Sequence, residues 1–253
     1  MISDQRHQTI INLLEDLGAV TVSDLVKEFK VSEMTIRRDL DILENQGLLR
    51  RVHGGAVSRR GRSYEPPFML RTSENLDNKI RISQAAANLI QNGDSITLDV
   101  GTTTLEIARH LQNKQDLTVI TPSLQIANEL INHPGIRLIL TGGILRIGEL
   151  SMVGHLAERI FEDFFVDKLF LGAGAVDLKT GVSEFNIEDA LVKRAMVKSA
   201  KSVVLVADSS KFNQVAFTAI VPLSEIHTII TDKELDPHLA TQIQAKGLEL
   251  ILA

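Results

Sequence analysis

The chain has 253 residues, of which 44% are hydrophobic and 23% are charged, and its formal net charge is −5 at pH 7. Because it contains no cysteine, disulfide bonds, thiolate metal sites and cysteine nucleophiles are excluded. No apolar run reaches the roughly 20 residues that span a bilayer, and residues 1–12 show no secretory signal. We therefore expect a cytoplasmic protein that does not associate with membranes.

The first 50 residues contain three helical patterns. The first covers residues 3–17, where apolar side chains form one stripe before Gly18. The second begins at Thr21, with Asp24 at the capping-box spacing. The third begins at Ser32 and ends before a glycine. The apolar residues at helical spacing in this third helix are Ile36, Leu40 and Leu43.

The segment after the third helix is typical of a small hairpin and is rich in arginine. Residues 48–52 and 56–57 flank the turn His53-Gly54-Gly55. Residues 37–62 contain seven arginines and three acidic residues, which gives this segment a charge of +4 although the net charge of the whole chain is negative. Two short helices, a third helix and a hairpin are the order of a winged helix-turn-helix, whose last helix enters the major groove of DNA.

Polar side chains on the third helix and around the hairpin are candidate contacts to double-stranded DNA. Glu33 and Arg37 share an outward face, with Arg38 beside it. Arginine forms two hydrogen bonds to guanine, and hydroxyl groups bond to bases or phosphates. An ordinary helical subdomain with solvated arginines is the alternative. The candidate residues are Ser32, Glu33, Thr35, Arg37, Arg38, Arg50, Arg51 and His53.

The rest of the chain divides into a linker and a larger domain. We expect a DNA-binding domain over residues 1–57, a linker over 58–78 and a ligand-sensing domain over 79–253; the linker contains Pro66-Pro67 and no sustained period. Near-continuously apolar strands then alternate with helices, which predicts an α/β domain with a doubly wound, mostly parallel sheet. The expected strands cover residues 95–100, 117–121, 136–141, 168–173, 202–207, 226–231 and 248–252, and the expected helices 79–91, 103–112, 123–132, 154–164, 187–200 and 236–246.

A candidate phosphate site lies where the first of these strands leads into a helix. The turn is Asp99-Val100-Gly101-Thr102-Thr103-Thr104. Backbone N–H groups and the helix dipole there favour an anion, and threonine hydroxyls add donors. A plain helix cap is the alternative, and the turn is not a P-loop because no Lys-Ser or Lys-Thr pair follows the glycine.

Three further loops follow predicted strands. Ligands in open α/β sheets gather at the carboxyl ends of strands, so we expect these loops to converge on one crevice. Taken singly, each is better explained as an ordinary turn. The loops are Thr141-Gly142-Gly143, Gly172-Ala173-Gly174-Ala175 and Asp208-Ser209-Ser210-Lys211.

One long motif is specific enough to suggest a family. It comprises Val31-Ser32-Glu33-Met34-Thr35-Ile36-Arg37-Arg38-Asp39-Leu40, Gly47-Leu48-Leu49-Arg50-Arg51 and His53-Gly54-Gly55-Ala56. This motif resembles the signature of the DeoR family of bacterial regulators, and the resemblance continues to the end of the chain. It implies a repressor of a carbohydrate-catabolism operon that a phosphorylated sugar releases from its operator. It also implies that Ser32, Thr35, Arg37 and Arg38 read the DNA.

The larger domain resembles the ribose-5-phosphate isomerase-like fold that such regulators use. By this resemblance Gly101–Thr104 matches the phosphate loop, Lys211 contacts a ligand oxygen, and Glu184, Asn186, Glu188 and Lys193 shape the choice of effector. Glu188 and Lys193 are equally consistent with surface residues. The candidate effector-binding residues are Asp99, Gly101, Thr102, Thr103, Thr104, Thr141, Gly142, Gly143, Gly172, Glu184, Asn186, Glu188, Lys193, Asp208 and Lys211.

Two other functions remain open: an activator of the same operon class, and an isomerase-like enzyme with a DNA-binding head. The enzyme needs a general base, for which Glu184 and Glu188 are the candidates. The acidic motif of the isomerases is interrupted at Val176, so we expect a regulator and no enzyme. The seven histidines include no pair at metal-ligand spacing, and we expect neither metal nor cofactor. One DNA-reading unit per chain predicts a homo-oligomer, either a dimer or a tetramer.

Overall fold

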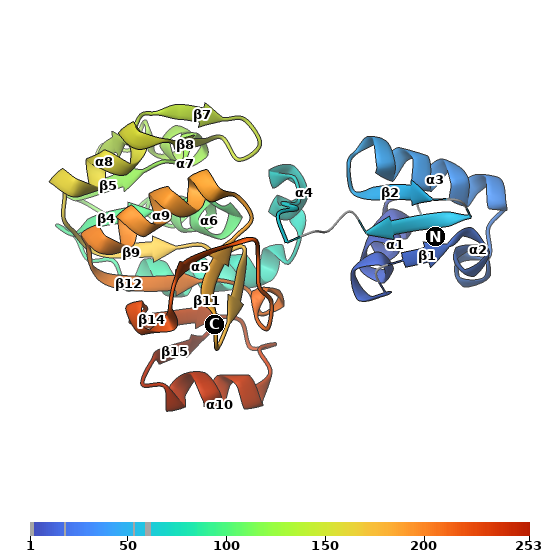
Figure 1. The fold of residues 1–253 in the computed structure, drawn as a ribbon. Coiled ribbons are helices and arrows are strands. Elements are labelled where there is room, and N and C mark those ends of the chain that lie inside the picture. Colours follow the sequence, from blue (N-terminus) through green and yellow to red (C-terminus); the bar gives the residue numbers. More distant parts are fainter. Residues whose placement is uncertain (1–2, 18, 53, 59–61) are drawn as a thin grey trace. The chain divides into compact units, whose positions relative to one another are not determined.

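The computed structural model describes residues 3–17, 19–52, 54–58 and 62–253, and the chain forms two compact units, Met1–Tyr64 and Glu65–Ala253 (Figure 1). Each unit has hydrophobic clusters of its own. None of the helices in the described part of the chain has the length and apolar character needed to cross a membrane.

The first unit combines three helices with a small antiparallel sheet. Two of the helices begin at the capping residues that the sequence predicts: the hydroxyl of Thr21 accepts the N–H of Asp24 at 3.1 Å, and that of Ser32 accepts the N–H of Thr35 at 3.2 Å. The sheet order is β1-β3-β2. The elements are α1 (Ser3–Leu17), β1 (Ala19–Thr21), α2 (Val22–Phe29), α3 (Glu33–Asn45), β2 (Leu49–Val52) and β3 (Gly55–Ser58).

The three helices and the predicted hairpin are confirmed, whereas strand β1 is an addition. Its three residues are too few to show an alternating pattern, and pairing with β3 makes them a strand. Gly18 and His53 lie outside the described residues. Ile36, Leu40 and Leu43 of α3 are fully buried in the core of this unit. Burying each such side chain stabilises the fold by roughly 1.5–3 kcal/mol.

The second unit is built on a sheet of seven parallel strands, which confirms the predicted α/β fold class. Every strand predicted for this sheet is present. In sheet order the strands are β15 (Glu249–Leu252), β14 (Thr228–Thr231), β12 (Ala200–Val206), β9 (Val166–Leu171), β4 (Ser95–Leu98), β5 (Leu117–Thr121) and β6 (Ile136–Leu140). The chain order reverses between β4 and β9, as in dinucleotide-binding doubly wound sheets.

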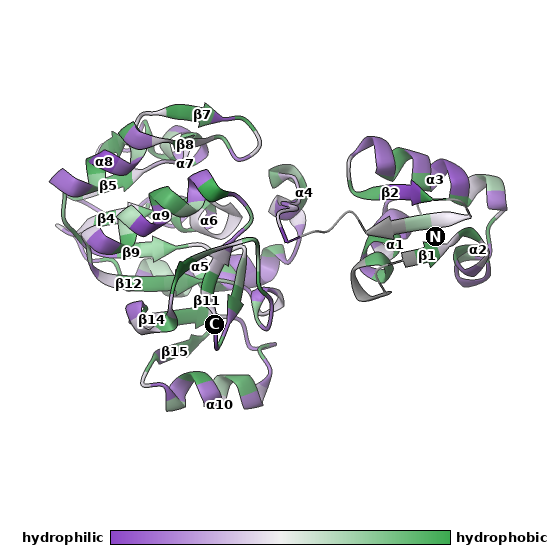
Figure 2. Cartoon of the chain, viewed as in Figure 1, coloured by the Kyte–Doolittle hydropathy of each residue, from purple (hydrophilic) through white to green (hydrophobic). Residues whose placement is uncertain are grey.

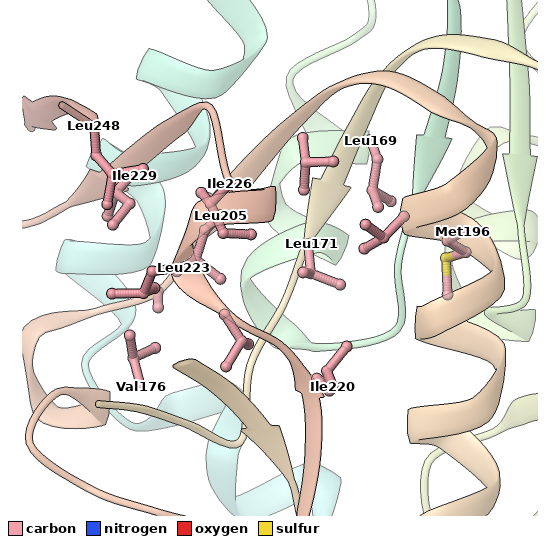
Figure 3. Packing of buried hydrophobic residues seen from close by; sticks show 14 of the residues in the cluster. Leu169, Leu171, Val176, Met196, Leu205, Ile220, Leu223, Ile226, Ile229 and Leu248 are labelled. Atoms are coloured by element: carbon pink, nitrogen blue, oxygen red, sulfur yellow. The ribbon is translucent and has the colours of Figure 1, made fainter. Parts of the chain in front are cut away.

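Both faces of the central part of this sheet are covered, which explains why its strands are mainly apolar (Figure 2). Leu169 and Leu171 of β9 pack into one hydrophobic cluster, and Phe170 between them packs into the other. The first cluster, part of which Figure 3 shows, includes residues of α8 (His155–Asp163), α9 (Ile187–Ser199) and α10 (Pro237–Ala245). The second includes residues of α5 (Leu76–Asn88), α6 (Thr102–Arg109) and α7 (Leu124–Leu130).

The structure differs from the sequence expectation in the segment expected to be a linker, residues 58–78. Glu65 already belongs to the second unit, and helix α4 (Phe68–Ser73) and the start of α5 fall inside that range. Pro66-Pro67 precedes α4 and does not disrupt it, because proline is tolerated at a helix start. Two small antiparallel sheets were also not predicted: β7 (Ile144–Arg146) with β8 (Ser151–Val153), and β10 (Ala175–Asp177) with β11 (Gly181–Glu184) and β13 (Thr218–Val221).

Candidate functional site

The solvent-facing side of α3 carries the candidate DNA contacts. Arg37 forms an ion pair with Glu33 one turn earlier at 2.5 Å, and both side chains are more than half exposed. Arg38 is exposed and forms no ion pair with any described residue. The hydroxyls of Ser32 and Thr35 lie 2.8 Å apart at the N-terminus of the helix. The polar groups that the sequence singled out are therefore presented together at one end of α3.

Arg51 and Arg50, which precede the wing turn, have different environments. The backbone N–H of Arg51 donates to Glu44 at 2.7 Å. Its guanidinium donates to the carbonyl oxygen of Arg37 at 3.1 Å and pairs with Asp41. Arg51 thus holds β2 against α3, whereas Arg50 is exposed.

A buried ion pair joins α1 to the inner side of α3. Asp39 is 3% exposed and accepts hydrogen bonds from Arg6 Nε at 2.6 Å and from Arg6 Nη2 at 3.0 Å. Nε2 of His7 lies 2.9 Å from the same carboxylate. Burial acts to raise the pKa of Asp39, but the hydrogen bonds and charges of Arg6 and His7 lower it below its usual value. This acidic residue is neutralised internally and adds no negative charge to the outer face of α3.

A pocket opens where three neighbouring strands of the large sheet end. Strands β12, β9 and β4 are adjacent, and the loops after them form its floor. This is the point of strand-order reversal, where ligands bind in doubly wound sheets. The space is about 620 Å³, including the part open to solvent. It is lined by Glu65, Arg71, Glu74, Lys79, Val100, Gly101, Thr102, Thr103, Thr104, Glu149, Gly172, Ala173, Gly174, Glu184, Asp189, Lys193, Val206, Ala207, Asp208 and Lys211.

One end of the pocket is formed by the N-terminus of α6. Gly101 precedes the helix with φ of 143°, a backbone conformation that side-chain-bearing residues rarely adopt. The first N–H groups of a helix have no partner within it. The hydroxyl of Thr104 donates to the carbonyl of Gly101 at 3.0 Å, while those of Thr102 and Thr103 form no hydrogen bond to another described residue. This end of the pocket offers several donors to an anion.

Two lysines that line the pocket, Lys79 and Lys211, form no ion pair with a carboxylate in the described structure. Lys79 is 4% exposed, and its ammonium donates to the carbonyl oxygens of Arg71 and Glu74 at the end of α4. Burial lowers the pKa of Lys79 to about 8, although Asp208 raises it, and nearby Lys211 lowers it further. The ammonium of Lys211 forms no hydrogen bond or ion pair among these residues. An anion bound here would relieve both charges.

A third lysine of the pocket lining, Lys193, pairs with two carboxylates. Lys193 is 2% exposed and lies 2.8 Å from Asp99 and 2.8 Å from Glu184. It also donates to the carbonyl of Gly172 at 3.0 Å, whose N–H donates to Asp99 at 2.8 Å. Burial raises the pKa of Asp99 to about 6. Burial opposes ionisation of Glu184 too, but the charge of Lys193 lowers the pKa of Glu184 below its usual value.

A chain of ion pairs that the sequence did not indicate adjoins the pocket, and Glu65, Arg71, Glu149 and Asp189 of this chain line it. Arg71 pairs with Glu149, and Arg146 pairs with Glu65 at 2.9 Å and with Asp189. These residues come from the expected linker, from the β7–β8 hairpin and from α9. No motif marks them, and only the fold brings their opposite charges together.

Most, but not all, of the predicted effector-binding residues meet in the pocket. Asp99 lies just beneath the lining. Thr141, Gly142 and Gly143 do not line the pocket, because they follow β6, an edge strand two positions from β4. Asn186 and Glu188 are also outside: the side chain of Asn186 caps α9, and Glu188 is exposed. The residues that do line the pocket are Gly101, Thr102, Thr103, Thr104, Gly172, Glu184, Lys193, Asp208 and Lys211.

The described residues contain no group of three or more histidine, aspartate or glutamate side chains placed to hold a metal ion. The pocket lining offers both hydrogen-bond donors and carboxyl acceptors. The fold and these two sites define a protein with a winged helix-turn-helix unit and a separate α/β unit that contains a charged pocket.

Comparison with known proteins identifies both units. Residues 6–61 match the model of the DeoR-like helix-turn-helix domain, and residues 74–233 match the model of the DeoR C-terminal sensor domain. The chain therefore belongs to the DeoR family of DNA-binding transcriptional regulators.

Relatives of similar length support this membership. The transcriptional regulator GlpR of Haloferax volcanii is 36% identical, with 99% of this chain and 98% of the relative covered. The transcriptional repressor AccR of Agrobacterium fabrum is 36% identical over 91% of this chain and 90% of its own. The regulator GolR of Listeria innocua is 33% identical over the whole of both chains. The chain is accordingly a regulator and not an enzyme.

The comparison with solved structures finds similarities of low sequence identity and low TM-score. Ribose 5-phosphate isomerase A from Methanocaldococcus jannaschii is 20% identical with a TM-score of 0.41, covering 55% of each chain. The Pyrococcus horikoshii translation initiation factor eIF-2B is 16% identical with a TM-score of 0.43, covering 90% of this chain and 82% of the other.

Proposed function

We propose that this regulator represses a carbohydrate-catabolism operon and that a phosphorylated sugar, bound in the pocket of the α/β unit, releases it from its operator. The observation that carries the ligand class is the anion end of the pocket. Lys79 and Lys211, with which no carboxylate pairs in the described structure, line the same pocket as the donors of Thr102 and Thr103. A phosphate has the charge and the acceptor oxygens to satisfy these groups.

Four carboxyl groups of the pocket lining suit the hydroxyl groups of a sugar. Glu65, Glu149, Glu184 and Asp189 line the pocket, and carboxyl oxygens accept hydrogen bonds. Sugar hydroxyls donate such bonds. Because these carboxylates are already held by arginine and lysine side chains, their positions are fixed before the ligand arrives.

On the DNA side, we propose that Ser32, Thr35, Arg37 and Arg38 contact the operator from the N-terminal part of α3. Arg38 is exposed without an ion-pair partner, whereas Arg37 must leave Glu33 to reach a base. A winged helix reads one half-site, so the active species is a homo-oligomer on a paired site. Effector and DNA binding would be coupled by about 1–3 kcal/mol or more.

The test is fluorescence-anisotropy binding to the DNA upstream of the protein's own operon, titrated with a panel of phosphorylated sugars. Tight binding that one sugar phosphate releases is the expected result. Thr103→Val removes a donor from the anion end, so the effector midpoint should rise about tenfold while DNA affinity stays unchanged. Thr241→Val, on the exposed side of α10, is the matched control. Binding indifferent to the whole panel, or an unchanged midpoint in Thr103→Val, would contradict the proposed site.

A further inference from the structure

The segment that begins the second unit, residues 65–79, is built into the wall of the pocket. We call it the strap; it contains α4 and the first residues of α5. Four of its charged side chains, Glu65, Arg71, Glu74 and Lys79, line the pocket. In the chain it directly follows the segment that leads from the DNA-binding unit. The strap is therefore both part of the ligand site and the covalent connection to the DNA-reading domain.

The C-terminal end of α4 is held by Lys79. The ammonium donates to the carbonyl oxygens of Arg71 and Glu74, which a six-residue helix leaves without internal partners. Such a short helix is marginal on its own and depends on contacts of this kind. Lys79 thus does two things at once: it caps α4 and it presents a buried, unpaired charge to the pocket.

The junction between α4 and α5 has the features of a hinge beside the anion end. Asn75 has φ of 50°, a left-handed conformation that asparagine tolerates better than most residues. Its side chain donates to Asp208 Oδ1 at 3.2 Å. Asp208 lines the pocket with Lys211. A change at the anion end therefore reaches the α4–α5 junction through direct contacts.

We propose that Lys79 couples the ligand to the strap: on binding an anion, its ammonium leaves the carbonyls of Arg71 and Glu74 for the ligand, and α4 loses its C-terminal anchor. This inference rests on the proposed function, because it takes the ligand to be an anion bound beside Thr102 and Thr103. In the state without ligand the ammonium of Lys79 contacts the two carbonyl oxygens, and in the bound state it contacts the ligand. The ligand therefore binds one state more tightly than the other, which any ligand-driven shift between two states requires.

The other contacts of the strap determine how firmly it stays attached to the pocket after the Lys79 ammonium moves to the ligand. Arg71 pairs with Glu149 and Glu65 pairs with Arg146, so the beginning of the strap is still attached to the pocket wall. The charge of Arg71 also acts on Lys79. An anion bound at Lys79 therefore competes with Glu149 for Arg71 and weakens that attachment as well. The freed segment is the one next to the DNA-binding unit in the chain.

The experiment is hydrogen–deuterium exchange on the full-length chain with and without inorganic phosphate. Phosphate is expected to slow exchange of the amides of residues 102–105 at the start of α6. It is expected to speed exchange of residues 70–73 in α4 by about tenfold, because the capping contacts are lost. Calorimetric titration of the same sample measures phosphate binding independently.

Variants separate the roles of the lysine. In Lys79→Met, α4 should exchange rapidly without phosphate and should show no further rise when phosphate is added, and phosphate should bind more weakly. Lys246→Met, at the exposed end of α10, is the control and should behave as the wild type. If Lys79→Met does not fold, the wild-type comparison still decides the question.

The failures of the two proposals differ. Phosphate that binds and protects residues 102–105 but leaves α4 unchanged, or slows its exchange, would overturn the coupling through Lys79 and keep the ligand site. Phosphate that neither binds by calorimetry nor protects residues 102–105 would overturn the anion site itself, and the coupling with it.

Discussion

At the scale of single residues, Glu65 links the pocket to pH. Burial raises its pKa to about 7, and the charge of Glu149 adds to this, whereas Arg146 lowers it. A raised pKa means that folding favours the protonated carboxyl, so this contribution to stability is full below about pH 4.5 and is lost as the pH rises towards 7. In Glu65→Gln the stability of the second unit should therefore fall less steeply between these values.

Chemical denaturation at a series of pH values measures this difference. The slope should not vanish, because Asp99, with a pKa raised to about 6, acts in the same direction. The matched control is Glu162→Gln, an exposed position on α8 that should keep the wild-type profile. Identical profiles for Glu65→Gln and the wild type would show that the carboxyl of Glu65 does not titrate in this range.

At the scale of elements, the helices α1 and α3 depend on the pairing of Arg6 with Asp39. Asp39→Asn leaves the buried guanidinium of Arg6 without a countercharge, which costs on the order of 3 kcal/mol. This is a large part of the total stability of a unit this small. We expect the first unit to melt at a lower temperature, with DNA binding weakened in proportion. Ligand binding should persist, because the second unit has its own cores.

Differential scanning calorimetry checks this through two separate transitions. Asp41→Asn on the same helix is the control: it removes the partner of Arg51, but at an exposed position where an ion pair contributes about 1 kcal/mol or less. Equal shifts in the two variants would mean that the buried pair contributes no more than the surface pair.

The elements also show which parts of the structure the sequence can predict. Strands covered on both faces have long apolar runs, so all seven parallel strands were predictable, and Thr21 and Ser32 marked their helices through local hydrogen bonds. Strand order is not a local property. Thr141 was expected in the pocket because its loop ends a strand, but β6 lies at the sheet edge. Lys79 was missed because its partners come from an apparently irregular segment.

At the scale of the whole molecule, the net charge of −5 and the DNA-binding function are reconciled by where the charges lie. Several acidic residues of the α/β unit line the pocket, and Asp39 is paired with Arg6 inside the first unit. The exposed arginines around α3 and the wing are then available to contact the phosphates of DNA. Affinity for operator DNA should therefore fall steeply with salt in spite of the acidic total.

The salt dependence of DNA binding distinguishes two possible contacts of Arg38. If its guanidinium contacts a phosphate, Arg38→Ala should weaken binding to all DNA sequences alike and reduce the slope of log affinity against log salt by about one. If it contacts a base, affinity for the operator should fall by about 1–3 kcal/mol while binding to unrelated DNA changes little. Anisotropy titrations at several salt concentrations distinguish the two results. Arg159→Ala on α8 provides a charge-matched control in the other unit, and a loss no larger than in that control would remove Arg38 from the interface.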